Sequence, residues 1–221
     1  VPYVCGVIGI FYNKNEVNEK EEEIDWNILW NSKYKNKILM FDNARDAFAI
    51  SLLRLGYSIN TSDCEAWKKA AEELICQKKI VQAYVMDQIF DKMRNGEAVL
   101  APYYSGDAAT LLKTNPSIGF VIPKNGTNKF IDSMCIPKSS AHKTQAEKYI
   151  NFMCEPEIAL ANVEKTGYST PHKEVYKRLS EDVKNNKIFY PDEEVIHNSQ
   201  VFVNLPKDIN VLMDELWVEV K

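Results

Sequence analysis

The sequence predicts an α/β fold built on one open sheet, and three observations support this. Between residues 13 and 125, short β-branched and aromatic runs alternate with amphipathic helical stretches. Two further extended segments, residues 4–12 and 130–136, bracket that region, and the chain beyond them is helix-rich. Strands that alternate with helices indicate a mostly parallel sheet covered on both faces.

The first elements follow from local composition. Residues 4–12 are apolar and contain two glycines, which predicts a buried strand approached closely by other backbone or by a ligand. A helix is expected over residues 25–30 and a short strand over 37–41. Asp42 and Asn43 then supply a helix N-cap, and the helix of residues 44–55 stops at a glycine.

The same pattern recurs along the chain. The expected helices and strands of the α/β region are 66–77, 81–85, 88–93, 98–104, 106–112 and 118–122. After the strand at 130–136, the expected helices are 142–154, 156–165, 172–179 and 207–218. If segments 4–12 and 130–136 run side by side, they form a two-stranded hinge, and the C-terminal helices belong to a second domain. The start Val1-Pro2-Tyr3, with no signal-peptide pattern, suggests a fragment.

Composition narrows the function. A chain of 221 residues with 45% hydrophobic and 26% charged residues is typical of a globular protein. Its 27 basic and 31 acidic residues are interspersed, so the sequence offers no basic surface for nucleic acid. No apolar run approaches the roughly 20 residues that span a bilayer.

Cysteine and histidine spacing argues against metal sites and catalysis. The five cysteines lack the spacing of zinc ligands, and their odd number argues against a disulfide framework. We expect buried or half-buried free thiols. The histidines are isolated, with no Ser/His/Asp or Cys/His pairing. The sequence therefore predicts neither an enzyme nor a metal or other cofactor.

Phe130 and Asp132 are the most informative pair. They stand two apart in an extended segment, so a ring and a carboxylate point to the same face. A flat ring and an anion that converge on one small cation are suited to binding an amine.

Many ordered motifs resemble the spermidine/putrescine-binding proteins of polyamine ABC transporters, over their C-terminal two-thirds. The resemblance covers nearly every residue to about Asn198. The matching runs are Val1-Pro2-Tyr3 with Gly6, Asp25-Trp26, Leu29-Trp30, Tyr34-Lys35, Asp42-Asn43-Ala44-Arg45-Asp46, Leu55-Gly56-Tyr57-Ser58, Asn60-Thr61, Gly96-Glu97, Tyr104-Ser105-Gly106-Asp107-Ala108, Asp132-Ser133, Ile136-Pro137, Ile150-Asn151-Phe152 and Gly167-Tyr168-Ser169-Thr170-Pro171.

The resemblance implies a type II periplasmic-binding-protein-like α/β fold, with two lobes that close around one ligand. Residues 10–126 would form the complete second α/β lobe. Residues 1–9 and 127–221 would form the hinge strands and the helix-rich C-terminal part of the first lobe, whose N-terminal part is absent. Such a half-lobe exposes apolar surface, so self-association of the truncated chain is an expectation.

The resemblance also implies a ligand-binding set. These residues are Asn43, Asp46, Tyr104, Asp107, Phe130, Asp132 and Tyr168. Asn43 stands where some relatives carry aspartate, and Phe130 replaces a tryptophan common in the family. Asp132 is expected to be a buried acid that a bound ammonium satisfies.

Five of these residues also have a structural alternative. Asp46 fits a helix capping box, Asp107 fits an ordinary acidic helix start, and Tyr104 and Tyr168 fit core packing. Asp132 also fits a structural salt bridge. Phe202 falls near a family ligand position, but the match is loose there and no role is carried over. The four tryptophans fit the core better than a site.

The function implied is an extracytoplasmic receptor that captures spermidine or putrescine for an ABC transporter permease. The location implied is a periplasm or the outer face of the cell membrane, where a lipid on an absent N-terminus would anchor it. Three alternatives stay open. One is a receptor for another cation or a metal chelate, one is an enzyme with a cysteine nucleophile, which needs a thiol of low pKa, and one is a structural or interaction module, for which the exposed half-lobe is the only argument.

Overall fold

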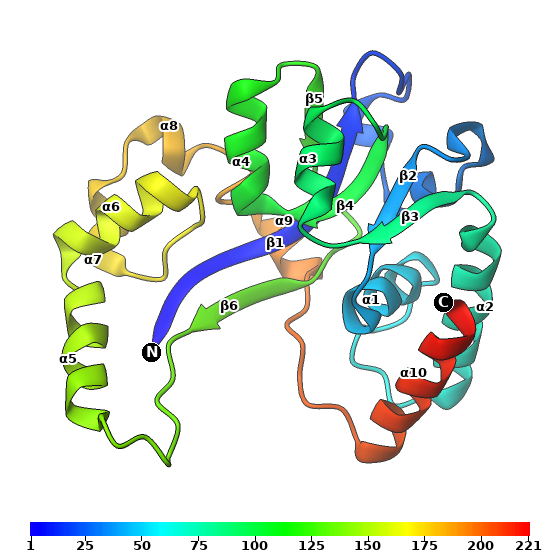
Figure 1. The fold of residues 1–221 in the computed structure, drawn as a ribbon. Coiled ribbons are helices and arrows are strands. Elements are labelled where there is room, and N and C mark those ends of the chain that lie inside the picture. The colour runs from blue at the N-terminus through cyan, green and yellow to red at the C-terminus, as the bar shows by residue number, and fades with distance from the viewer.

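The computed structural model describes all 221 residues, and its centre is a six-stranded mixed sheet (Figure 1). Five strands follow the order β3-β2-β4-β1-β5, and β6 pairs with β1 outside that row. The strands are β1 Pro2–Asn13, β2 Ile38–Phe41, β3 Val81–Val85, β4 Leu100–Tyr104, β5 Ile118–Val121 and β6 Lys129–Ser133. The predicted α/β class is therefore confirmed, with every expected strand present.

The direction of β1 differs from the prediction of a mostly parallel sheet. Strand β2 is parallel to β3 and β4, but β1 lies between β4 and β5 and is antiparallel to both. The reason is topological: β1 is the first strand and has no preceding helical crossover, so nothing requires it to run parallel to its neighbours.

Helices cover both faces of the sheet. The first four are α1 Ala44–Arg54, α2 Cys64–Lys78, α3 Gln88–Arg94 and α4 Ser105–Thr114. Helices α3 and α4 pack against one face, whereas α1 packs on β2 from the other face and α2 packs on α1 (Figure 1). The helix expected over 25–30 is a 3-10 helix, Trp26–Trp30, one of three short 3-10 turns with Glu21–Glu23 and Ser32–Tyr34.

The two bracketing segments pair as the hinge prediction requires. Val4 lies opposite Asp132 and Gly6 opposite Phe130 in an antiparallel ladder between β1 and β6. Beyond Val7, the same strand β1 continues into the main sheet, where Ile8 pairs with Tyr104. One long strand thus pairs first with β6 and then with β4 inside the main sheet.

The chain beyond β6 forms a small helical part. Its helices are α5 Lys143–Met153, α6 Pro156–Thr166, α7 Lys173–Arg178, α8 Glu181–Lys184 and α9 Glu193–Asn198, of which α8 and α9 were not predicted. Only four of its residues form a buried apolar cluster, and α5 has no buried residue at all.

The last helix corrects the predicted grouping of residues 127–221. Helix α10, Lys207–Val220, packs on α2 and α1 rather than on the helical part (Figure 1). Ile209 and Met213 belong to the main core, and Trp217 packs against Phe48 and Tyr84. An amphipathic helix packs on the largest apolar surface it can reach, and here that surface is the outer side of α1 and α2.

We refer below to β1–β5 with α1–α4 and α10 as the α/β unit, and to α5–α9 as the helical part. The main core of 41 buried residues lies in the α/β unit. Trp26 and Trp67 are fully buried there, and Trp30 and Trp217 pack against it, as predicted. The thiol prediction is wrong for Cys64, Cys76 and Cys135, which are exposed because they lie on outward helix faces or in the loop after β6.

None of the helices combines the length and the apolar character that crossing a membrane requires.

Candidate functional site

The N-terminus of α1 supplies the first carboxylate. Asn43 caps the helix, because its side-chain oxygen accepts a hydrogen bond of 3.1 Å from the backbone N–H of Asp46. Asp46 is only 6% exposed, and its Oδ2 accepts a hydrogen bond of 3.0 Å from the Tyr104 hydroxyl. The cap therefore fixes a buried carboxylate that already has one donor.

The junction of β4 and α4 supplies a second acid and a ring. Tyr104 is the last residue of β4, and Asp107 lies in the first turn of α4. Asp107 Oδ2 accepts a hydrogen bond of 3.0 Å from Tyr168, which comes from the loop after α6. Two tyrosine–aspartate pairs are thus built around the end of one strand, where ligands gather in open α/β sheets.

Strand β6 supplies Phe130 and Asp132. The Phe130 ring stands edge-on to Tyr104, with centroids 5.6 Å apart, and it also meets Tyr168 at 6.2 Å. Asp132 follows on the same face of the strand, and its side chain is exposed. The ring therefore links the two tyrosine–aspartate pairs, with the exposed carboxylate beside it.

Two glycines make room for two of these rings. A Cβ atom on Gly6 would lie 2.4 Å from the Phe130 ring, and one on Gly106 would lie 2.3 Å from the Tyr168 ring. Any larger residue would push the ring away, since nonbonded carbons do not approach so closely. This explains one of the two strand glycines noted in the sequence.

Most of these groups line a single cavity of about 430 Å³. Its walls come from α1, β4, β6, the loop after α6 and the segment after α9. The lining residues are Asn43, Arg45, Asp46, Tyr104, Asn128, Phe130, Asp132, Tyr168 and Phe202.

Burial sets the electrostatics of the cavity. Desolvation raises the pKa of Asp46, and the hydrogen bond from Tyr104 and the charge of Arg45 offset this only in part. Burial likewise raises the pKa of Asp107 against the hydrogen bond from Tyr168. The pKa values of Tyr104 and Tyr168 are raised by burial and by these carboxylates, so both hydroxyls stay protonated and donate. A bound cation would relieve the cost of the buried charges.

Six of the seven predicted site residues line the cavity: Asn43, Asp46, Tyr104, Phe130, Asp132 and Tyr168. Asp107 does not line it and lies behind Tyr168 as its hydrogen-bond acceptor. The expectation that Asp132 is buried is wrong: the residue is exposed, on a strand at the rim of the sheet that pairs only with β1. The geometric convergence was predicted; the binding role remains a prediction.

Three lining residues were missed. Arg45 stands inside a motif quoted above for its neighbours, Asn128 directly precedes β6, and Phe202 was considered without a role. Arg45 and Asn128 each have a buried side-chain atom without a hydrogen-bond partner. Arg45 is a cation, and amine binding gives no reason to expect a cation among the acids of the site. Only the fold therefore shows that Arg45 lines the cavity.

The arrangement is suited to holding positive nitrogen. Carboxylates accept hydrogen bonds from ammonium groups, and rings pack on methylene carbons and attract cations. No serine, cysteine or histidine lines the cavity, and no group of three or more His, Cys, Asp or Glu side chains is placed to hold a metal ion. Burial, then the charge of Asp132, raises the pKa of the Cys5 thiol, the opposite of what a nucleophile needs.

Comparison with known families and proteins identifies the family of the chain. The model of the family described as bacterial extracellular solute-binding protein matches residues 1–197. The spermidine/putrescine-binding periplasmic protein of Salmonella typhimurium is 33% identical over 221 residues, which is all of this chain and 63% of the relative. Its Escherichia coli counterpart is 35% identical over 200 residues, or 90% of this chain and 57% of the relative.

A solved structure shows the same fold. The spermidine/putrescine ABC transporter substrate-binding protein PotD from Streptococcus pneumoniae superimposes with a TM-score of 0.85 at 33% identity, covering 100% of this chain and 68% of that one. The chain thus spans less than two thirds of the length of the curated Salmonella relative.

Proposed function

The chain belongs to the bacterial extracellular solute-binding protein family. On that premise we propose that it acts as a receptor that captures spermidine or putrescine for an ABC transporter. Members of this family bind solutes outside the cytoplasm and do no chemistry on them, so the chain is a binding protein rather than an enzyme and is extracytoplasmic. A permease in the membrane would be its partner, and a lipid on a preceding N-terminus would keep it at the cell surface.

One observation supports the polyamine ligand above the others. Two carboxylates, Asp46 and Asp132, share one cavity with the rings of Tyr104, Phe130 and Tyr168. Polyamines are flexible chains of methylene carbons with ammonium groups, so they need acids for their nitrogens and flat apolar faces for their stems.

The binding mode follows from burial. An ammonium group at Asp46 would add a donor to a carboxylate that already accepts from Tyr104 and would neutralise its buried charge. The methylene stem would then lie along Phe130, and the second ammonium group would reach Asp132. Because Asp132 is exposed, closure of a second wall over it would strengthen that contact.

We further propose that the chain carries one complete lobe and part of another. The α/β unit would be the complete lobe, β1 and β6 the hinge, and the helical part the C-terminal portion of the other lobe. The outer face of α5 agrees with this, since Tyr149 and Phe152 are 59% and 46% exposed. Apolar surface of this kind is normally covered by more protein, and it would also drive self-association of this chain. Sedimentation that finds only monomer at about 100 μM would refute the self-association proposal.

Chemical-shift mapping by NMR tests the polyamine ligand on this chain as it stands. We expect putrescine, at about 1–10 mM and constant ionic strength, to shift saturably the resonances of residues around Asp46, Tyr104 and Asp132. Uncharged 1,4-butanediol, which has the same carbon chain, serves as the control and should leave them unchanged. Shifts that are equal for the two compounds, or that fall outside the cavity, would contradict the proposal.

Affinity tests the two-lobe proposal separately. Closure needs both lobes, so this chain should bind spermidine weakly, with a dissociation constant of about 1 mM or above. Isothermal titration that gives micromolar or tighter binding would show that a single lobe suffices.

A further inference from the structure

The segment from Ser199 to Pro206 brings the chain back from the helical part to the α/β unit. It is extended and lies between α9 and α10, so it is a third connection beside β1 and β6 (Figure 1). Phe202 in this segment lines the cavity, although no strand or helix holds it there. The nearest backbone pairing is the bridge between Gln200 and Asn128, two residues earlier, so Phe202 itself needs another contact to fix its position.

Asn60 holds the backbone on both sides of Phe202. Its Nδ2 donates to the carbonyl oxygen of Val201 at 2.9 Å, and its Oδ1 accepts from the backbone N–H of Val203 at 3.1 Å. Ser58 in the same loop donates to the Gln200 side chain at 2.6 Å. Side chains of the loop after α1 thus hold the backbone around Phe202 by hydrogen bonds, as the backbone of a neighbouring strand would.

Arg45 completes the attachment from the side of the cavity. Its Nη2 donates to Asn60 Oδ1 at 2.8 Å, and its guanidinium lies 4.6 Å from the centroid of Phe202 and 5.6 Å from that of Trp67. The charge of Asp46 acts on this guanidinium without a salt bridge between the two, and Arg45 Nη1 is buried without a hydrogen-bond partner. A cation at this place repels an ammonium ligand, so direct ligand binding does not explain it.

We propose that Arg45 and Asn60 are positioning residues that together hold the Phe202 ring as a wall of the ligand cavity. We call this pair of residues the Arg45–Asn60 clamp. Planar guanidinium groups stack on rings while they donate in their own plane, which lysine cannot do. Phe202 would then move with the α/β unit when the lobes close, and the ring would offer its face to the ligand stem. The effect on ligand binding rests on the polyamine function proposed above.

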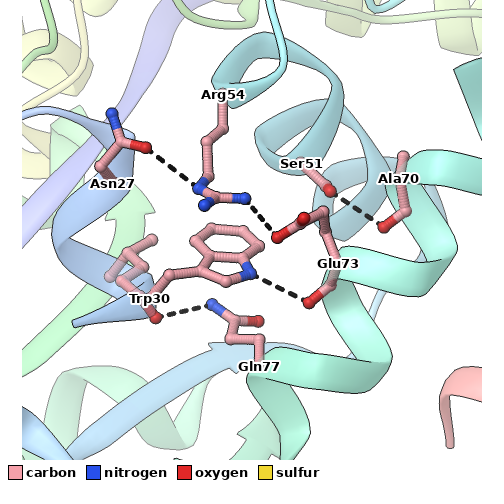
Figure 2. Close-up of polar contacts among 8 residues, drawn as sticks. Asn27, Trp30, Ser51, Arg54, Ala70, Glu73 and Gln77 are labelled. Carbon is pink, nitrogen blue, oxygen red and sulfur yellow. Dashed lines mark hydrogen bonds and ion pairs between the residues drawn. The ribbon is translucent and has the colours of Figure 1, made fainter. Parts of the chain in front are cut away.

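The same helix offers a matched control at its other end. Arg54 also stacks on a ring, at 4.7 Å from the centroid of Trp30, and donates to Asn27 at 3.0 Å (Figure 2). Unlike Arg45, it forms an ion pair, with Glu73, and it does not line the cavity (Figure 2). Loss of Arg54 should therefore affect stability without affecting the Phe202 segment.

Amide exchange without ligand tests the clamp directly. In Arg45→Gln and Asn60→Ala, exchange of the Val203 amide should accelerate about tenfold, whereas Arg54→Gln should leave it unchanged. Equal Val203 protection in wild type and both clamp variants would overturn the proposal, whether or not the protein binds polyamines.

A titration with putrescine tests the positioning role. Arg45→Gln removes a positive charge, so electrostatics alone would tighten binding, but the clamp predicts weakening by about threefold or more. Phe202→Leu should weaken binding similarly, and the double variant should lose no more than either single one. Tighter, unchanged or additive results would refute the positioning role. Absence of wild-type binding would instead refute the polyamine function and leave the clamp to the exchange result.

Discussion

The α/β unit and the helical part differ in the size of their buried cores. The α/β unit has a core of 41 buried residues. The helical part buries only Ala159, Val163, Val175 and Leu179 as a cluster, and α5 buries nothing. Of the cavity-lining residues, only Tyr168 comes from the helical part. The α/β unit and β6 with its preceding residue supply most of the rest, so the candidate site depends little on the helical part.

This difference bears on how the site works. Asp46 and Tyr104 stand on a rigid helix end and strand end, and Phe130 stands on the hinge strand. Groups on packed elements need little reorganisation before they bind, so part of the site is preformed. The side facing the helical part supplies less, and closure would have to complete it.

The largest effect should separate the two regions by stability. Phe48→Ala empties a fully buried site between Trp67 and Trp217 and should cost about 3–5 kcal/mol of unfolding free energy. Val175→Ala removes buried apolar surface from the small cluster and should cost about 2 kcal/mol of unfolding free energy there. Urea unfolding should shift strongly for the first variant, and amide exchange should quicken only in α6 and α7 for the second. A global shift from Val175→Ala would mean that the regions unfold as one.

The next effect distinguishes site from core along one strand. Gly6 and Gly9 can be compared, because a Cβ atom on either would lie 2.4 Å from a ring, that of Phe130 or that of Phe120, although on Gly9 it would also lie 2.6 Å from the backbone oxygen of Val121. Each glycine-to-alanine change should cost about 1–3 kcal/mol through overpacking. Only Gly6→Ala should also weaken putrescine binding, by about tenfold, since it displaces the Phe130 ring. Equal binding losses in an NMR titration would show that ring position in the cavity is unimportant.

A smaller effect concerns the buried Asp46. Because burial raises its pKa, the folded chain holds this proton more tightly than the unfolded chain does. Its contribution to stability is thus greatest below the unfolded pKa of about 3.9 and falls as the pH rises to the folded pKa.

Asp46→Asn should therefore be more stable than wild type at pH 7, and the difference should vanish near pH 4. Urea unfolding at both pH values measures this. Lower stability of the variant at pH 7 would mean that the ionised carboxylate stabilises the α/β unit, contrary to the raised pKa.

The smallest effect concerns the hinge ring. Phe130→Trp offers a larger and more electron-rich face to a cation, so putrescine should bind about twofold to fivefold more tightly. The same titration measures it, with Phe120→Trp as a control in the core. Weaker binding would show that the space over Gly6 is too small for the larger ring, and that this steric cost exceeds the gain from a more electron-rich face.

Much of the α/β unit was predictable because its signals are local. Helix 44–55, its Asn43 cap and strand 81–85 follow from periodicity and capping chemistry, and they appear with nearly the expected bounds. The ends of β4 and α1 were predictable site positions because side chains gather where strands end. The direction of β1 and the return of α10 were not, since long-range packing decides both.

The missed parts of the site have the same origin. Phe202 is held at the cavity by Asn60, whose partners Val201 and Val203 lie 141 and 143 residues later in the chain. No local pattern encodes a contact over that separation. Exposure of Asp132 depends on what packs over β6, which its own sequence does not determine. Local rules placed residues on elements, and only the fold placed elements beside each other.

The central claim is that carboxylates of the α/β unit and the hinge strand bind positive nitrogen together. Its most direct test is NMR titration of wild type, Asp132→Asn and the double variant Asp46→Asn/Asp132→Asn with putrescine, with Glu72→Gln as an exposed control on α2. We predict about tenfold weaker binding for Asp132→Asn, no measurable binding for the double variant and no change for the control. Wild-type affinity in the double variant would contradict the claim.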